Sequence, residues 1–148
     1  MSSGEFMKYN SIEQMVAEDI ELINEARKAL CKAHAPYSNF KVGAAVRLSS
    51  GRVVHGSNQE SEVYPAGMCA ERVVLFYTAS EYANDLIESV AIASSPSQRE
   101  CSPCGECRQV LLDMERRQGS PIRVIMSSES SATVAPSAES LLPLSFKL

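Results

Sequence analysis

The chain has 148 residues, 45% of them hydrophobic, which suffices for one compact domain and is short for two independent ones. Its net charge of −4 argues against a protein that binds the nucleic-acid backbone, because such proteins usually carry a basic patch. No apolar run is long enough to cross a membrane, and the polar N-terminus lacks the apolar core of a signal peptide. We therefore expect a soluble cytoplasmic protein with no membrane partner, whose five cysteines are reduced.

Residues 1–10 are predicted to be a flexible leader, and residues 11–148 a single domain. Ser11 and Gln14 form a capping box that predicts a helix start. Apolar residues then recur at helical spacing as far as Ala33. Pro36 disfavours helical geometry at the residue before it, so we expect this helix to end near His34.

Strands and helices alternate along the rest of the chain. Short runs rich in β-branched residues predict strands, and apolar side chains at helical spacing predict helices. Gly43 lies inside the first strand, where a glycine often marks close approach by another backbone or a ligand. The expected strands are 40–48, 53–58, 87–93 and 122–126, and the expected further helices are 68–79 and 105–117. The serine-rich segment 127–140 has no pattern, and 141–146 is expected to form a turn that docks apolar side chains.

The resulting order is helix, hairpin, helix, strand, helix, strand. A helix between successive strands allows parallel neighbours with helices on both faces of the sheet. We therefore predict an α/β protein, a three-layer α/β/α sandwich with a mixed sheet that is antiparallel at its hairpin end.

Two of the predicted helices begin at cysteines. Cys69 and Glu71 fall in the first turn of one helix, where the partial positive charge favours a thiolate and a carboxylate. Cys104 and Cys107 lie one helical turn apart at the start of the next helix, directly after Pro103. Three thiolates can hold one zinc ion and leave its fourth position to a water, whose pKa the metal lowers toward neutrality. Glu71 would stand beside the metal without binding it and could transfer protons.

Other assignments of these residues remain open. Cys101 extends the pair to C-x-x-C-x-x-C, and a fourth thiolate would close the zinc shell and make the site purely structural. An iron–sulfur cluster is a further alternative, although the usual fourth spacing is lacking. Arg72 could donate hydrogen bonds to the sulfurs, or it could be an ordinary surface arginine on the same helix.

At these residues the chain resembles the cytidine deaminases, in particular their small class with three cysteine ligands, which is typically homotetrameric. The resemblance covers nearly the whole chain after the leader, in the family's order. It is carried by Pro36-Tyr37-Ser38, Phe40-Lys41-Val42-Gly43-Ala44-Ala45, Asn58-Gln59-Glu60, Cys69-Ala70-Glu71-Arg72, Pro103-Cys104-Gly105-Glu106-Cys107-Arg108-Gln109 and Leu141-Leu142-Pro143-Leu144-Ser145-Phe146.

The resemblance implies a hydrolase that deaminates cytidine and deoxycytidine to uridine and deoxyuridine in pyrimidine salvage, with Zn2+ as its cofactor. It implies that zinc is bound by Cys69, Cys104 and Cys107, that Glu71 shuttles protons, and that Arg72 supports the ligands. The substrate residues that it implies are Asn58 and Glu60 for the sugar hydroxyl, Phe40 for the pyrimidine, the Ala70 backbone for the base, and Tyr64 and Phe146 for completing a pocket, of the same or a neighbouring subunit.

Three other functions are alternatives to this one. A deaminase of the same fold could act on a cytosine-containing antibiotic such as blasticidin S, but Asn58 and Glu60 favour a plain ribose. A deaminase that edits nucleic acid is disfavoured by the net charge. From a different class, a zinc-stabilised binding module would hold the metal and perform no chemistry.

Overall fold

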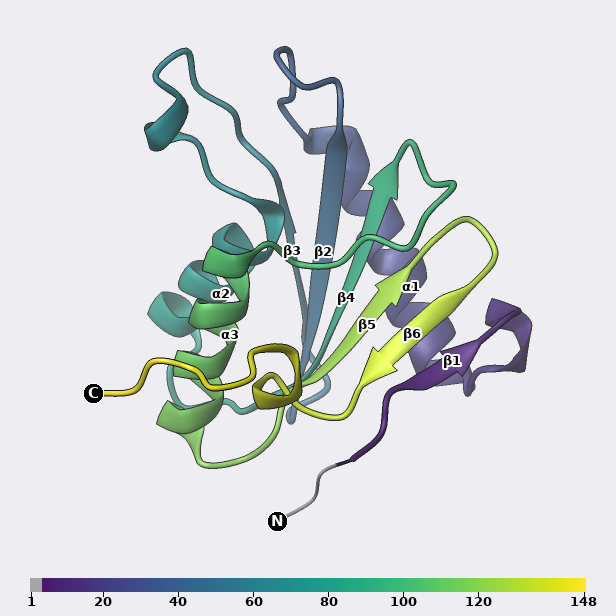
Figure 1. Ribbon diagram of the computed structural model, residues 1–148, viewed down its shortest axis with the longest axis vertical. Coiled ribbons are helices and arrows are strands. Elements are labelled where there is room, and N and C mark those ends of the chain that lie inside the picture. Colours follow the sequence, from purple (N-terminus) through teal and green to yellow (C-terminus); the bar gives the residue numbers. More distant parts are fainter. Residues whose placement is uncertain (1–3) are drawn as a thin grey trace.

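A six-stranded mixed sheet forms the centre of the molecule (Figure 1). The structure is a computed structural model that describes residues 4–148. The strands of this part of the chain are β1 (Met7–Tyr9), β2 (Lys41–Leu48), β3 (Val53–Ser57), β4 (Ile87–Ser95), β5 (Arg123–Ser127) and β6 (Ala132–Ala135). They lie side by side in the order β1-β6-β5-β4-β2-β3.

The direction of each strand follows from its connection. β2 and β3 form the expected antiparallel hairpin, and β4 pairs with the other edge of β2, also antiparallel. β4 and β5 are parallel neighbours because the helix α3 (Gly105–Gln118) crosses back between them. β6 and β1 extend the sheet beyond β5 as antiparallel strands.

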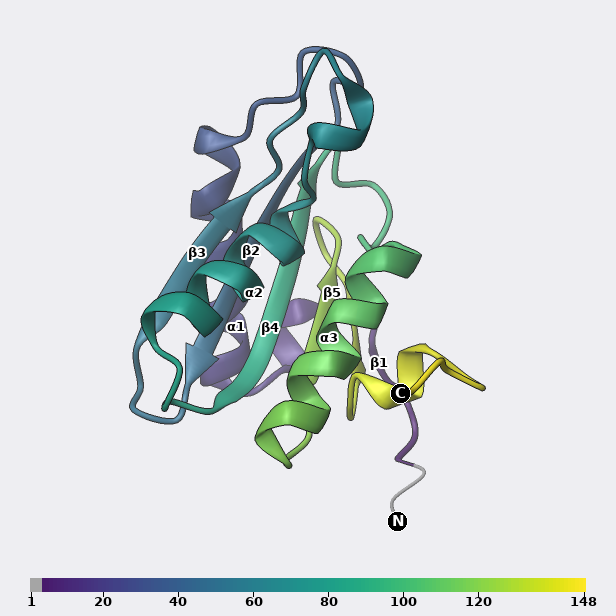
Figure 2. The same ribbon diagram turned by 90° about the vertical axis from the view of Figure 1, so that its left-hand side faces the viewer.

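Helices cover both faces of the sheet. α1 (Ala17–Ala29) packs on one face, while α2 (Ala70–Glu81) and α3 (Gly105–Gln118) pack side by side on the other (Figures 1 and 2). Each face has its own buried hydrophobic cluster. The predicted three-layer α/β/α sandwich with a mixed sheet is therefore confirmed. None of the helices in the described residues is both long and apolar enough to span a membrane.

Two glycines allow the helices to approach the sheet closely. A Cβ atom on Gly43 of β2 would lie 2.2 Å from the carbonyl oxygen of Ala26 in α1. A Cβ atom on Gly56 of β3 would lie 2.9 Å from the carbonyl oxygen of Ala70, in the first turn of α2. The close approach predicted at Gly43 is thus made by a helix backbone, and Gly56 fixes the position of the first turn of α2 in the same way.

The N-terminal predictions need correction. The first three residues of the expected leader lie outside the described residues, but Met7–Tyr9 form strand β1 and pair with β6. Ser11 precedes a 3₁₀ turn (Ile12–Gln14), with no hydrogen bond from its side chain, and α1 begins only at Ala17. The chain breaks the helical pattern here because Ile12 donates its backbone N–H to the carbonyl of Ser130 and buries its side chain.

The sequence predicts the C-terminal segment only in part. β6 lies in the serine-rich stretch that showed no pattern, and this short strand is supported by pairing with β5 on one side and β1 on the other. A 3₁₀ helix η4 (Glu139–Leu141) follows and buries Leu141 as expected. Leu144 and Phe146 of the same expected turn remain exposed, so these two side chains do not dock within the chain.

Candidate metal centre and active site

Three thiols converge where α2 and α3 begin. Cys69 is the N-cap residue of α2, Cys104 is the N-cap residue of α3, and Cys107 lies in the first turn of α3. Their three sulfur atoms all lie within 4.8 Å of one another. The two helices pack side by side, so their positive N-terminal ends favour thiolates at the same point.

The spacing of the sulfurs fits a zinc ion. Tetrahedral zinc with Zn–S distances of about 2.3 Å separates its sulfur ligands by about 3.8 Å. The sulfurs of Cys69 and Cys104 are 3.7 Å apart. Cys101 lies outside this cluster of described residues, and burial raises the pKa of its thiol to about 12. The geometry therefore brings together the three predicted thiols and leaves out the fourth.

Arg72 contacts the sulfur cluster. One guanidinium nitrogen donates to the sulfur of Cys69 at 3.5 Å, and another lies 3.6 Å from the carboxylate of Glu106. A hydrogen bond with Cys107, helped by Arg72, lowers the pKa of the Cys69 thiol to about 5. Arg72 thus adds positive potential beside a cluster that three thiolates would make negative. The sequence left open whether Arg72 donates hydrogen bonds to the sulfurs or is an ordinary surface arginine, and the structure favours the first alternative.

Glu71 is a buried carboxyl group beside these thiols. It is the second residue of α2, and only 4% of it is exposed to solvent. Burial, together with the nearby Cys69, raises the pKa of this carboxyl group to about 7, against an opposing backbone hydrogen bond. A carboxyl group in such a setting can both hold and release a proton near neutral pH.

A cavity of about 500 Å³ opens beside the metal centre. Its lining includes five of the predicted site residues: Asn58, Glu60, Tyr64, Cys69 and Arg72. Tyr37 also lines it, and the rings of Tyr37 and Tyr64 meet edge to face with centroids 5.8 Å apart. A concave site with aromatic walls and a few polar groups is typical of small-molecule binding.

Glu60 is held in place by the loop before β2. Its Oε1 accepts hydrogen bonds from the backbone N–H groups of Tyr37 at 2.9 Å and Ser38 at 3.2 Å. Its Oε2 accepts a short bond from the Ser38 hydroxyl. The bond from the Ser38 hydroxyl has the largest effect and lowers the pKa of the Glu60 carboxyl group, and the two backbone bonds lower it further. About four lone-pair sites are available on a carboxylate, so one acceptor position of Glu60 stays free for a ligand.

Asn58 is fixed at the end of β3 by the backbone of β2. Its Nδ2 donates to the carbonyl of Phe40 at 2.9 Å, and its Oδ1 accepts from the N–H of Val42 at 2.9 Å. A primary amide has two donors and two lone pairs, so Asn58 retains one of each. Its side chain therefore fixes the position of Phe40 and keeps hydrogen-bonding capacity for a ligand.

The other predicted substrate residues lie outside the cavity lining. Ala70 is fully buried in the first turn of α2, where its backbone is close to Gly56. Phe40, just before β2, is 42% exposed, and Phe146 is 69% exposed on the C-terminal segment. Sequence reasoning gave no role to Ser38, which orients Glu60. The only sign in the sequence that Ser38 has a role is that the run Pro36-Tyr37-Ser38 is part of the resemblance to the cytidine deaminases.

Similarity to known proteins agrees with this geometry. The family model for the "Cytidine and deoxycytidylate deaminase zinc-binding region" matches residues 16–118. The chain belongs to this deaminase family. It is therefore an enzyme of a zinc-dependent hydrolase family, and this membership decides against a zinc-stabilised binding module.

Individual members of the deaminase family are similar over most of the chain. The cytidine deaminase of Halalkalibacterium halodurans is 41% identical over 93 residues, which are 63% of this chain and 69% of that protein. The crystal structure of cytidine deaminase from Burkholderia pseudomallei has a TM-score of 0.76 at 36% identity, covering 89% of this chain and 100% of that one. The cytidine deaminase structure from Mycobacterium tuberculosis has a TM-score of 0.70 at 31% identity, covering 90% and 100%. The predicted resemblance is confirmed.

Proposed function

We propose that this enzyme hydrolyses cytidine and deoxycytidine to uridine and deoxyuridine, with release of ammonia, and so serves pyrimidine salvage. The observation that carries the proposal is the meeting of three sulfurs and the buried Glu71 beside a cavity that contains Asn58 and Glu60. The names of the relatives support the same substrate. Because thiolate ligands must stay reduced, we place the enzyme in the cytoplasm.

The metal in this proposal is zinc, held by Cys69, Cys104 and Cys107. Their sulfur spacing supports a tetrahedral ion with one position left for water. When bound, zinc would polarise that water and so supply the nucleophile. Arg72 would offset part of the negative charge of the three thiolates through its hydrogen bond to Cys69.

Glu71 moves the protons in this scheme. Its carboxylate takes a proton from the attacking water and delivers it to N3 of the pyrimidine, while the water oxygen bonds to C4. It then passes the second proton of the water to the amino group at C4, which leaves as ammonia. Its position two residues after Cys69, at the buried start of α2, supports this role.

The nucleoside is oriented by residues at the other end of the cavity. Asn58 and Glu60 each retain free hydrogen-bonding capacity, which suits a shared sugar hydroxyl. Phe40 would flank the pyrimidine, and the backbone of Ala70 would meet the base. Among the described residues that line the cavity, Arg72 is the one cation, and it already contacts Cys69 and Glu106. This charge balance favours an uncharged nucleoside over a nucleotide or a nucleic acid.

A homotetramer would complete these pockets. Tyr64 and Phe146 are 74% and 69% exposed, which is unusual for residues that enclose a ligand within one chain. Exposed aromatic side chains beside a site often mark a contact with another subunit. In the proposed assembly, Phe146 closes a pocket at a subunit contact.

The test is a spectrophotometric assay of cytidine deamination with a proton-transfer variant. Wild-type enzyme loaded with zinc is expected to deaminate cytidine. Glu71→Gln should bind as much zinc and lose at least about 10²–10⁴-fold in kcat, because the amide cannot transfer protons. Zinc content is measured on the same samples. A zinc-loaded wild type without activity on cytidine would refute the proposal, and near-normal kcat in Glu71→Gln would show that this residue is structural.

A further inference from the structure

Arg108 of α3 joins two distant parts of the backbone. Its Nε donates to the carbonyl oxygen of Pro103 at 2.7 Å, and its Nη1 donates to the carbonyl oxygen of Leu141 at 3.0 Å. Both acceptors belong to buried residues, and the side chain of Arg108 is itself partly buried. One rigid guanidinium group therefore binds two carbonyl groups 38 residues apart in the sequence.

The first of these bonds acts on the approach to the metal centre. Pro103 directly precedes Cys104, the thiol at the N-cap of α3. Its carbonyl lies before the helix and has no place in the helical hydrogen-bond ladder. A buried carbonyl without a donor is costly, so the bond from Arg108 fixes the peptide group that leads into Cys104.

The second bond acts on the C-terminal segment. Leu141 ends the 3₁₀ helix η4, which lies along α3 in both ribbon views (Figures 1 and 2). Glu115 of α3 holds the start of η4, since its carboxylate accepts from the N–H groups of Ala138 at 2.7 Å and Glu139 at 3.1 Å. Arg108 and Glu115 thus fix the two ends of η4 on the same helix.

We propose that Arg108 is a positioning residue that couples the C-terminal segment to the metal centre. The guanidinium group holds the peptide before Cys104 and the end of η4 in one fixed arrangement, so that the position of the Cys104 thiol depends on where η4 is docked. This inference rests on the proposed zinc site and adds to it a residue that touches neither metal nor substrate.

Only an arginine can form both of these hydrogen bonds in a fixed geometry. A planar guanidinium presents several N–H donors in fixed directions and can bind two acceptors at once. A lysine ammonium is a single point charge, so Arg108→Lys can retain one of the two bonds but not their mutual geometry. The lysine variant therefore tests the bridge separately from the positive charge.

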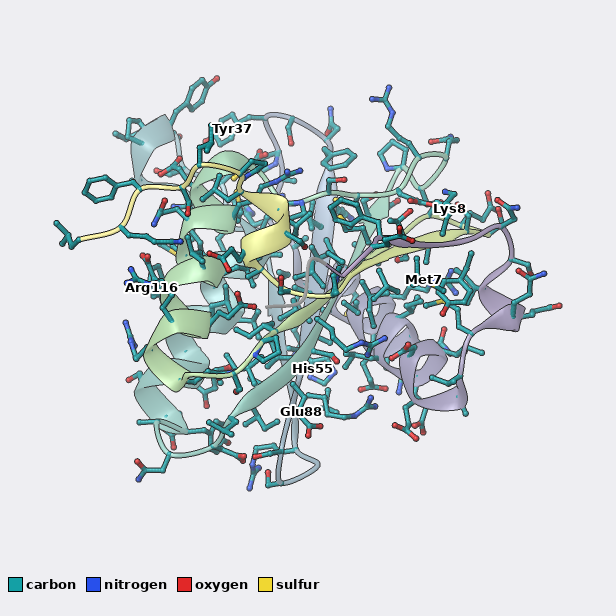
Figure 3. The ribbon with its side chains drawn as sticks, turned by 60° about the horizontal axis from the view of Figure 1, so that its bottom comes forward. Met7, Lys8, Tyr37, His55, Glu88 and Arg116 are labelled. Carbon is teal, nitrogen blue, oxygen red and sulfur yellow. The ribbon has the colours of Figure 1, made fainter. Side chains whose placement is uncertain are left out.

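The experiment measures zinc release from the full-length, zinc-loaded protein to an excess of a chromogenic chelator. Residues that orient metal ligands typically contribute about 10–100-fold to metal affinity, so Arg108→Ala should release zinc about 10–100-fold faster than wild type. Arg108→Lys should fall between the two. Arg116→Ala is the matched control, because this arginine lies on the exposed side of the same helix (Figure 3) and should release zinc at the wild-type rate.

A second control separates positioning from a general loss of stability. Ile125→Ala removes a fully buried side chain from the core on the other face of the sheet, away from Arg108 and its two hydrogen bonds. Thermal unfolding is followed for every variant, and Arg108→Lys provides the comparison if Arg108→Ala does not fold. The inference is supported if the Arg108 variants release zinc faster than Ile125→Ala, although Ile125→Ala loses at least as much stability as they do.

The coupling to η4 is measured by amide hydrogen exchange in the same zinc-loaded variants. The Arg108 variants should exchange faster at Leu141 and Leu142, whose N–H groups form the bonds of η4. Wild-type zinc release in Arg108→Ala, or unchanged exchange in η4, would overturn the inference while leaving the proposed function intact. A wild type that takes up no zinc would instead overturn the proposed metal centre, and the inference with it.

Discussion

Glu60 is the side chain whose surroundings most affect the expected specificity for nucleosides. A site built to bind a hydroxyl group penalises a ligand that lacks it, because the polar groups of the site are then left unpaired. Glu60 has one acceptor position left after its bonds to Tyr37 and Ser38. The free base cytosine has no sugar to fill that position, so it should be a poor substrate.

We predict that Glu60→Ala lowers kcat/KM for cytidine by about 10–100-fold, the effect of losing a hydrogen bond to a charged group. Residual activity on cytosine should change little. Glu62→Ala is the control, because this carboxylate is exposed on the same loop and lies outside the cavity lining. Steady-state kinetics on both substrates measure the effect. Equal use of cytosine and cytidine by wild type, or an equal loss in Glu62→Ala, would contradict direct sugar binding by Glu60.

Cys101 provides a test of the metal ligands. Its sulfur lies outside the cluster formed by Cys69, Cys104 and Cys107, and its backbone N–H is bonded to the carbonyl of Ser127. We predict that Cys101→Ser keeps one zinc per chain and its activity, whereas Cys69→Ser loses most of its zinc. Metal analysis of the purified variants measures this. Loss of zinc from Cys101→Ser would favour the closed four-thiolate site, which has no open position for catalysis.

At the scale of elements, the contact between β3 and α2 sets where the catalytic turn lies. Gly56 lies against the backbone of Ala70 and against Val74. An added Cβ atom would come within 2.9 Å of the backbone nitrogen of Val74 and 2.8 Å of its Cβ atom. Backbone atoms cannot move aside alone, so the whole first turn of α2 would have to shift. Cys69 and Glu71 would move with it.

We predict that Gly56→Ala lowers the free energy of unfolding by about 1–3 kcal/mol, the usual cost of overpacking. It should also lower kcat, because the first turn of α2 carries Glu71. Urea denaturation and the cytidine assay measure the two effects. Gly105→Ala is the control for stability, since its added methyl group would meet nothing within 4 Å. A Gly56→Ala variant as stable and active as wild type would show that the close packing is not required.

At the scale of the whole molecule, the exposed C-terminal side chains point to assembly. Leu144, Phe146 and Leu148 are exposed on a segment that η4 anchors to α3. Apolar side chains held outside the core by an anchored segment suit a contact with another copy of the chain. The pocket would then depend on the assembly, since Phe146 does not line the cavity of its own chain.

We predict a homotetramer with a mass of four times 16.1 kDa, about 64 kDa, by light scattering. Phe146→Ala should raise KM for cytidine, or shift the assembly toward smaller species, because it removes the aromatic ring proposed to close the pocket. Lys147→Ala is the control on the same segment, as it removes only an exposed ion pair with Glu139. An active wild-type monomer would exclude pockets shared between subunits.

The sequence by itself determined the elements whose patterns are local. The hairpin, the helices that begin at the cysteines and the strands between them are set by side-chain periodicity and by Gly and Pro, which act over a few neighbouring residues. The three candidate ligands and the candidate proton-transfer residue could be named for the same reason, because Cys69 with Glu71, and Cys104 with Cys107, each lie within one helical turn. The sandwich followed from the order of these elements.

Only the tertiary structure decided which distant groups meet. No local pattern relates Cys69 to Cys104, whose sulfurs are 3.7 Å apart, or Ser38 to Glu60, or Arg108 to Leu141. The run C-x-x-C-x-x-C leaves the role of Cys101 open, and the folded chain places its sulfur outside the cluster. Strands β1 and β6 are too short for their own propensities to specify them, and they form because each finds a partner across the sheet. Such contacts depend on the packing of whole elements, so their physical cause appears only in the folded chain.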